Sequence, residues 1–472
     1  MAEALVFYPS PAIGHLVSMV ELGKLILTHC PSISIHILVT NQAYDAGATT
    51  PYIASVSATV PSLTFHHLSA ISLPPDYSTT SPNLETLALD LIRLNNPNIR
   101  QALESITREY SVKAFVMDFF CSVVQPIVRE LRVPSFFFFT SGAGFLSFFL
   151  YWPILHEKYT ENFKDLKLCL PVPGLPPLPA GDVAKPLLVR DDPCYVGLLN
   201  SAVQLRTSDG IIVNSFDKLE PRAIQAIVDG ECIPGGSTPP LFCIGPLISS
   251  ESRRGEDGHA LPGFFSWLDA QPGGSVVFLC FGSLGVFSVE QLKAIATGLE
   301  NSLQRFLWVV KNPDTTAKGD FDLRPLLPDG FLDRTDGRGM LVKSWVPQVE
   351  VLKHGSVGGF VTHCGWNSVL EAVSAGVPMI AWPLYAEQRH NRVMMVEEMG
   401  IALGVEESEG GFVAEEAVER VVKELMLSAG GLRDKMSCLK GEAGVAMREG
   451  GSSHVALSKF TRNVVGPGNV FN

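Results

Sequence analysis

Residues 357–371 read Val-Gly-Gly-Phe-Val-Thr-His-Cys-Gly-Trp-Asn-Ser-Val-Leu-Glu, a pattern that predicts a strand, a tight turn and the start of a helix. The strand is expected over Val357–Val361, and Gly365 would permit the turn. Asn367 or Ser368 could cap the new helix, whose backbone N–H groups and positive dipole end would then face a ligand. The stretch therefore suits the binding of a pyrophosphate.

A second strand of the same half ends in a similar way. Ser275–Phe281 precedes Gly282 and Ser283, so a small hydroxyl residue again follows a strand. His363, beside the first turn, could donate to the same anion. Two ordinary helix caps and a core tryptophan would explain the pattern equally well, and on spacing alone both interpretations stay open.

Apolar segments alternate with helical periodicity along most of the chain, and helices are expected over 16–28 and, as one long stretch, over 83–110. Strands are expected at 4–8, 32–40, 63–68, 114–118, 135–140, 209–214, 275–281, 305–310, 339–343, 357–361 and 378–382. Apolar strands that do not alternate, joined by helices, indicate parallel sheets with both faces covered. In such α/β folds ligands lie at the carboxyl ends of the strands, and we expect them in a cleft between the two halves.

The composition changes between Gly230 and Gly263, where proline, glycine, serine and charged residues cluster. Such a run buries little apolar area and is typical of a linker. We expect two Rossmann-like βαβ domains and a terminal helix, with the divisions 1–243, linker 244–263, 264–452 and 453–472.

The composition of the 472 residues excludes several classes of protein. Hydrophobic residues make up 46%, which excludes a disordered chain, and 36 basic against 48 acidic residues give a net charge of -12. An acidic field repels phosphate backbones and anionic lipids, so nucleic acid and membrane surfaces are not expected partners. An anionic ligand would need a local binding device.

Cysteine usage and the apolar segments bear on location. The nine cysteines are scattered without a CxxC pair, which indicates free thiols in a reducing compartment. The N-terminus lacks the basic region of a signal peptide. The uncharged stretch Val133–Leu155 contains Pro134, Gly142 and Gly144, which favours a strand, turn and helix over a membrane span. We expect a soluble, cytoplasmic protein.

The first half offers a possible acid–base pair. His15 lies with Gly14 between the first strand and the first helix, where the helix dipole favours a neutral imidazole that can act as a base. Asp118 ends the strand 114–118 and could accept the Nδ1 proton of His15. A capping histidine and a capping aspartate are the alternative, and the pattern alone does not separate the two.

The sequence gives little support for a nucleotide-binding loop, a serine hydrolase or a metal site. The chain has no GxxxxGK[ST] and no GxSxG, and Gly142-Ala-Gly144 lacks the third glycine of a dinucleotide fingerprint. No HxxxH or HxH occurs, and His66 and His67 would point to opposite faces of a strand. We expect no metal.

A long C-terminal segment resembles the signature of plant family-1 UDP-glycosyltransferases. The matching residues are Trp345-Val-Pro-Gln348, His363-Cys-Gly-Trp366-Asn-Ser368, Glu371 and Glu387-Gln388. Gly14-His15, Asp118-Phe-Phe-Cys and Phe-Thr140-Ser also resemble the family, so the likeness spans nearly the whole chain. The flavone and isoflavone 7-O-glucosyltransferases look most similar.

The resemblance implies a GT-B fold, in which two Rossmann-like domains face each other across a cleft and the C-terminal helix returns to the first domain. It also implies binding roles. Trp345 would stack on uracil, and its neighbour Val346 (often alanine in the family) would be a further donor-binding residue. Gln348 and Glu371 would bind the ribose, and the pyrophosphate would be held by Ser283, His363, Asn367 and Ser368. The sugar would be faced by Trp366, Glu387, Gln388 and Thr140, and the acceptor by Gly14, Phe119 and Phe120.

The expected activity is transfer of glucose from UDP-glucose to a flavonoid or related phenol, with inversion. His15 would be the general base, oriented by Asp118, and no cofactor would be needed. Phe119, Phe120 and Phe136–Phe139 would offer aromatic surface to the acceptor, although phenylalanine in a buried strand more often belongs to the core. By resemblance, Gln388 and Trp366 favour glucose as the donor sugar, and the protein would be a monomer.

Two alternatives remain for the activity. The same base could activate a phloroglucinol-type ring and give a C-glucoside. A UDP-sugar-binding protein without catalysis is the more remote alternative, because a pure binder would not need the pair His15 and Asp118.

Overall fold

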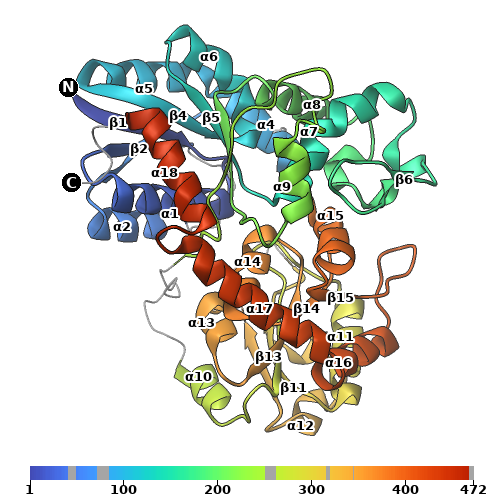
Figure 1. The fold of residues 1–472 in the computed structure, drawn as a ribbon. Helices are drawn as coiled ribbons and strands as arrows, with labels where there is room; N and C mark the ends of the chain where they lie inside the picture. The colour runs from blue at the N-terminus through green and yellow to red at the C-terminus, as the bar shows by residue number, and fades with distance from the viewer. Residues whose placement is uncertain (41–48, 72–83, 250–261, 315–318, 344, 467–472) are drawn as a thin grey trace. The chain divides into compact units, whose positions relative to one another are not determined.

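The computed structural model describes residues 1–40, 49–71, 84–249, 262–314, 319–343 and 345–466. The chain divides into two compact units, the first formed by Met1–Ser249 with Val445–Asn472 and the second by Ser250–Gly444 (Figure 1). The domain divisions after residues 243, 263 and 452 remain predictions from the sequence.

The first unit contains a seven-stranded parallel sheet in the order β3-β2-β1-β4-β5-β8-β9. Its strands are β1 (Ala2–Tyr8), β2 (Ser34–Val39), β3 (Leu63–His67), β4 (Tyr110–Asp118), β5 (Ser135–Phe139), β8 (Gly210–Val213) and β9 (Leu241–Cys243). A separate antiparallel pair is formed by β6 (Cys169–Leu170) and β7 (Leu178–Pro179).

Helices cover both faces of this sheet because its strands are apolar on both faces; all five residues of β5 are buried. The α-helices are α1 (Ile13–His29), α2 (Thr49–Thr59), α4 (Leu84–Leu94), α5 (Asn96–Glu109), α6 (Gln125–Glu130), α7 (Ala143–Lys158), α8 (Pro193–Leu205), α9 (Pro221–Val228) and α18 (Ser452–Val465). Shorter 3₁₀ turns are η1 (Phe119–Val124), η2 (Phe163–Asp165), η3 (Ala180–Asp182) and η4 (Lys185–Leu187).

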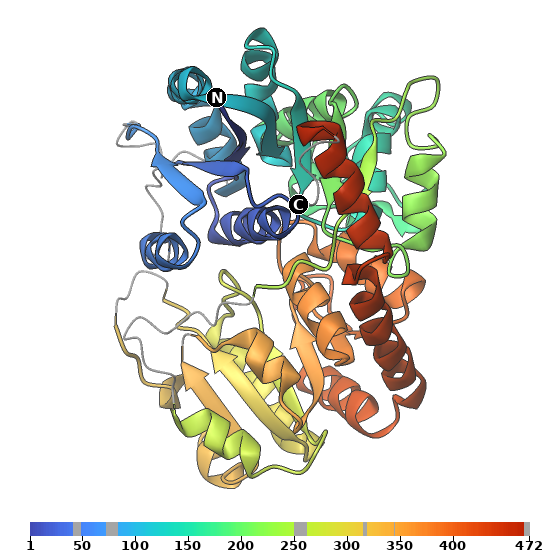
Figure 2. The same cartoon turned by 60° about the vertical axis from the view of Figure 1, so that its left-hand side comes forward.

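The C-terminal helix α18 packs into the first unit beside α1, as both views show (Figures 1 and 2). The Phe460 ring lies 5.2 Å from the ring of Phe136 on β5 and 5.5 Å from that of Phe242 on β9. All three side chains are buried. Each buried ring contributes roughly 2–3 kcal/mol of hydrophobic stabilisation, so the end of the chain is part of the N-terminal core.

The second unit contains a six-stranded parallel sheet in the order β12-β11-β10-β13-β14-β15. Its strands are β10 (Val276–Cys280), β11 (Arg305–Val310), β12 (Gly339–Lys343), β13 (Val357–Thr362), β14 (Met379–Ala381) and β15 (Ala402–Gly404). Its helices are α10 (Pro262–Asp269), α11 (Val289–Ser302), α12 (Phe331–Arg334), α13 (Gln348–Lys353), α14 (Trp366–Ala375), α15 (Gln388–Val393), α16 (Glu415–Leu427) and α17 (Gly430–Met447), with the turns η5 (Arg324–Leu326) and η6 (Met394–Glu398).

The expected parallel α/β architecture is confirmed, with differences in detail. The single helical stretch expected over 83–110 is two helices, α4 and α5, and Asn83 lies outside the described residues. The interruption falls at Asn95, whose amide donates to the Leu91 carbonyl, and Pro97 follows in the first turn of α5. Tyr110 begins β4 in an extended conformation.

The composition shift after Gly230 is not wholly a linker. Cys232 and Phe242 are fully buried, and β9 completes the first sheet. Strands β9 and β15 have three residues each, which is too short for a periodicity signal, and the sequence analysis missed both.

The uncharged stretch 133–155 forms β5, a turn and most of α7, as expected. Its phenylalanines lie in the interior of the first unit. Among the described helices, none has the length and apolar character that crossing a membrane would require.

Two histidines meet across the neighbouring strands β2 and β3, of which His36 is buried and His66 half-buried. His36 is 3% exposed, and its Nδ1 lies 2.8 Å from Nε2 of His66. The ring of Tyr110 lies 4.5 Å from that of His36. Burial, and secondarily His66, lower the pKa of His36 to about 4, and burial also lowers the pKa of His66.

We expect this pair to make the protein less stable in mild acid. The unfolded His36 titrates near its ordinary pKa of 6.5, so between pH 6.5 and 4 the unfolded state binds more protons. Stability is therefore complete above pH 6.5, falls as the pH drops toward 4 and levels off below it. His36 alone would account for about 2 kcal/mol at pH 5.

Unfolding at pH 7.5 and pH 5, measured for the wild type and His36→Phe, checks this prediction. The variant lacks the titrating group and should lose less stability between the two pH values, whatever its stability at pH 7.5. An equal loss in both proteins would contradict it.

Candidate active site

The structure brings His15 and Asp118 together. Helix α1 begins at Ile13 rather than at Leu16, so His15 lies inside its first turn and not in the preceding loop. His15 Nδ1 lies 2.7 Å from Oδ2 of Asp118, the last residue of β4. Asp118 is fully buried, whereas the His15 side chain is 26% exposed. The imidazole thus combines access to solvent with a buried carboxylate behind it.

Thr140, which follows β5, completes a small network. Its hydroxyl donates to Asp118 Oδ2 over 3.0 Å and lies 2.9 Å from His15 Nδ1. The other carboxylate oxygen, Oδ1, accepts the backbone N–H of Phe120 over 3.0 Å. Because the carboxylate accepts hydrogen bonds on both oxygens, the proton of a neutral His15 belongs on Nδ1, which leaves Nε2 as the basic atom.

The expected aromatic residues divide into two groups. The Phe120 ring meets His15 edge-on at 5.7 Å, and the Phe119 ring lies 6.5 Å from it. Phe136–Phe139 are buried, which confirms the interpretation that phenylalanine in this strand belongs to the core and not to an acceptor surface. Within the core, the Phe139 ring lies 4.7 Å from that of Phe119. A side chain at Gly14 would meet nothing within 4 Å.

In the second unit, the turn after β13 leads into α14 as expected, but the helix is capped differently. Its first residue is Trp366, its N-cap is Gly365, and no side chain caps it. Asn367 and Ser368 are the second and third helical residues, so neither is the expected cap. The Ser368 hydroxyl instead accepts from Gln348 Nε2 over 2.9 Å.

Gly365 is needed for space rather than for its backbone angle. Its φ is -64°, and the left-handed residue of the turn is Cys364, with φ of 67°. A Cβ added to Gly365 would come within 3 Å of Nε2 of His363, and so would a Cβ on Gly282, the second residue after β10. The imidazole of His363 therefore lies against two glycines.

His363 is buried, and one of its two ring nitrogens lacks a hydrogen-bond partner among the described residues. The residue is 7% exposed, and the nitrogen concerned is Nδ1. Burial, and secondarily the charge of Lys311, lower its pKa to about 4. A neutral imidazole with an unused nitrogen at the N-terminus of a helix is suited to an anionic ligand.

The remaining residues of the signature lie as follows. Gln348, the first residue of α13, donates from Nε2 to Glu371 Oε2 over 2.6 Å. Trp345, two positions after the end of β12, is half-buried, and Val346 is 3% exposed. Ser283 is exposed in the turn that follows β10. Trp366 is 3% exposed.

Gln388 is almost completely buried. It is 2% exposed, and its Oε1 accepts the backbone N–H groups of Leu384 and Tyr385 over 2.8 and 2.9 Å. Its amide oxygen thereby closes the turn before α15. Glu387 is the N-cap of α15 and is half-buried.

Two residues of this region were missed from the sequence. Lys311 directly follows β11, and its Nζ donates to the Gly282 carbonyl. Asn391 on α15 donates to the Cys364 carbonyl over 3.0 Å and so ties α15 to the turn. For Lys311 a signal existed, because it follows an apolar strand just as Asp118 ends one; for Asn391 the sequence holds none.

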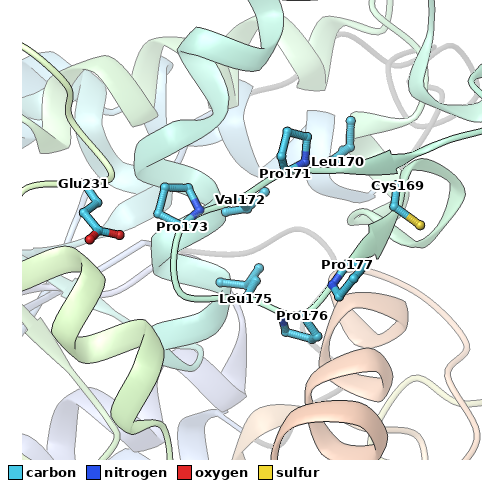
Figure 3. Close-up of a pocket in the computed structure, with 9 residues that line it drawn as sticks. All are labelled: Cys169, Leu170, Pro171, Val172, Pro173, Leu175, Pro176, Pro177 and Glu231. Atoms are coloured by element: carbon cyan, nitrogen blue, oxygen red, sulfur yellow. The ribbon is translucent and has the colours of Figure 1, made fainter.

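Two cavities lie apart from these residues. One, of about 470 Å³, is lined by residues 169–173 and 175–177 and by Glu231 (Figure 3). The other, of about 480 Å³, lies beside the pair His36 and His66. None of the predicted site residues lines either cavity. Within the described ranges, no cluster of three or more His, Cys, Asp or Glu could hold a metal ion.

The comparisons with known proteins agree on one family. The protein-family model described as UDP-glucoronosyl and UDP-glucosyl transferase matches residues 264–428 of the sequence. UDP-glycosyltransferase 88B1 of Stevia rebaudiana is 47% identical over 462 residues, which are 98% of this chain and 99% of the relative. A phloretin 2'-O-glucosyltransferase of Malus domestica is 48% identical over 485 residues, 98% of this chain and 100% of the relative.

A solved structure extends the agreement to the fold. Phytolacca americana UGT2 complexed with UDP-2fluoro-glucose and pterostilbene matches with a TM-score of 0.88 and 36% identity, over 98% of this chain and 100% of that one. Two relatives are more than 45% identical to this chain over almost their whole length, and the solved structure shares its fold over the same span. Together they show to which family the chain belongs. The chain belongs to the UDP-glycosyltransferases of plants, enzymes with the GT-B fold.

Proposed function

We propose that the enzyme transfers glucose from UDP-glucose to a hydroxyl group of a flavonoid or related phenol, with inversion at the anomeric carbon. The observation that carries the proposal is the contact of 2.7 Å between His15 Nδ1 and the buried Asp118. It fixes the tautomer that presents Nε2 as a base and supplies the charge that stabilises an imidazolium.

The reaction is a single displacement. His15 Nε2 takes the proton of the acceptor hydroxyl, the oxygen forms its bond to the anomeric carbon, and the bond from that carbon to UDP breaks. Attack on the face opposite the leaving group inverts the carbon. Asp118 balances the positive charge of the imidazolium, and a phenol, with a pKa near 10, needs only modest help to ionise.

The donor is assigned to the second unit. The N-cap of helix α14 is Gly365, which has no side chain that could cap the helix, and Nδ1 of the buried His363 nearby has no partner among the described residues, which supports a diphosphate there. The paired polar groups of Gln348 and Glu371 suit ribose hydroxyls. We assign Trp345 and Val346 to uracil, Ser283, His363, Asn367 and Ser368 to the diphosphate, and Trp366, Glu387, Gln388 and Thr140 to glucose.

Two features of the structure and two similar proteins support a phenolic acceptor. The edge-on Phe120 ring beside His15 offers an aromatic neighbour to a planar molecule, and Gly14 leaves open space next to the imidazole. The relative from Malus domestica is named for phloretin, and the solved structure of Phytolacca americana UGT2 holds pterostilbene; both compounds are phenols. The flavone 7-hydroxyl favoured by the sequence remains a prediction.

Tandem mass spectrometry tests the proposal. The purified enzyme is incubated with UDP-glucose and a pool of flavones, isoflavones, dihydrochalcones and simple phenols, with UDP-galactose in a parallel reaction. A product that loses the whole hexose on fragmentation is an O-glucoside and supports the proposal. Fragmentation only across the sugar ring would show a C-glucoside and overturn O-transfer. UDP-glucose binding without any product would favour a non-catalytic protein.

Replacing His15 by alanine should reduce turnover by about 10²–10⁴-fold, because it removes the general base. Asp118→Asn should have a smaller effect, since the base is retained while its orientation and charge balance suffer. His29→Ala, in the last turn of the same helix α1, is the matched control and should leave kcat nearly unchanged. Nearly full turnover in His15→Ala would refute the mechanism.

Thr140→Val should lower kcat because it removes the hydroxyl that contacts both His15 and Asp118. Thr140→Ser keeps that hydroxyl and should restore most of the activity. Steady-state kinetics of the two variants distinguish this from a packing effect. A loss of kcat in Thr140→Ser with full kcat in Thr140→Val would show that only the methyl group matters and would contradict the prediction.

Gly365→Ala should weaken UDP binding by at least about tenfold, because the added methyl group would push His363 out of its place. Gly441→Ala, where a methyl group meets nothing within 4 Å, is the control. Calorimetric titration with UDP measures the effect. An unchanged affinity of Gly365→Ala for UDP would show that His363 does not belong to the donor site.

A further inference from the structure

Lys311 is a half-buried cation that forms no ion pair with any of the described residues. It directly follows β11, and its Nζ donates to the backbone carbonyl of Gly282. Among the residues that the structure describes, no carboxylate forms an ion pair with it, and burial lowers its pKa. An ammonium group removed from water and bonded only to a neutral carbonyl is unfavourable unless a further anion is present.

The surroundings of Lys311 point to where that anion binds. Gly282, which accepts the hydrogen bond of Lys311, also lies against the ring of His363. The charge of Lys311 contributes to keeping His363 neutral, and the unused Nδ1 of His363 is buried in the same region. Two nitrogen-bearing side chains therefore flank one turn.

Strand order places the helix N-terminus of α14 in the same region. Strand β10 lies between β11 and β13, and all three run parallel. Their carboxyl ends therefore share one edge, where Lys311, Gly282 and the turn into α14 follow one another across the sheet. In a chain with a net charge of -12, these groups form a local site of positive potential.

We propose that Lys311 is a positioning residue for the diphosphate of the donor. It holds the Gly282 turn through its hydrogen bond and provides the positive charge that balances the diphosphate, both in the bound donor and as UDP leaves. The inference rests on the proposed function, because it takes the anion to be that of a UDP-sugar.

Three substitutions separate the charge from the hydrogen bond. Lys311→Arg keeps both, Lys311→Gln keeps a donor for the Gly282 carbonyl without the charge, and Lys311→Met removes both. UDP and uridine are titrated into each protein by calorimetry, since uridine shares the base and ribose but has no phosphate. Lys293→Met, an exposed position on α11, makes the same change in net charge and is the control.

We expect Lys311→Gln and Lys311→Met to bind UDP about 10- to 100-fold more weakly, as when a charged hydrogen-bonding partner is lost. Lys311→Arg should recover most of the affinity, and uridine binding should stay unchanged in all variants. Lys293→Met should resemble the wild type. In steady state, the KM for UDP-glucose should rise in the neutral variants.

Three results would overturn the inference. Wild-type UDP affinity in Lys311→Gln would show that the charge is not used. An equal loss for uridine and UDP would show that the turn has merely collapsed, and melting temperatures of the variants identify that case independently. A wild-type enzyme that does not bind UDP would refute the donor assignment itself, and the inference with it.

Discussion

Parallel pairing of every neighbouring strand within the two main sheets is the constraint on which the site depends. It brings the carboxyl ends of adjacent strands to one edge, so the residues that end or follow those strands become neighbours. Asp118 and Thr140 meet in this way from β4 and β5, and Lys311 and Gly282 from β11 and β10. Residues far apart in the chain thus form sites without any long loop to position them.

The surroundings of Asp118 and those of Lys311 differ in the sign of the charge that they bury. Asp118 is a buried negative charge, and the site offsets its desolvation with hydrogen bonds from His15, Thr140 and a backbone N–H. Around Lys311 and His363, one group is a cation for which no described carboxylate forms an ion pair, and the other is an imidazole whose Nδ1 has no partner among the described residues. In the function that we propose, the first arrangement prepares a base and the second receives an anion.

Some features of the fold and the site could not be predicted from local patterns. Phe136–Phe139 are buried because helices cover both faces of a parallel sheet, whereas the sequence had also allowed them to face a ligand. Ser368 was a candidate helix cap, yet its hydroxyl accepts from Gln348, twenty positions earlier in the chain. Partners distant in the sequence decided both outcomes. The break at Asn95 is different, because it is a local effect at Asn95 and Pro97 that helical periodicity alone does not register.

The sequence by itself determined the strand–helix alternation, the two parallel sheets, the strand-end position of Asp118 and the family signature, because these depend on local hydrophobic periodicity and residue identity. Only the tertiary structure decided which side chains meet. The Thr140 contact with His15, the approach of His363 to two glycines and the partial burial of Lys311 beside Gly282 all join segments separated in the chain. Such contacts follow from strand order and packing, which no single stretch of sequence specifies.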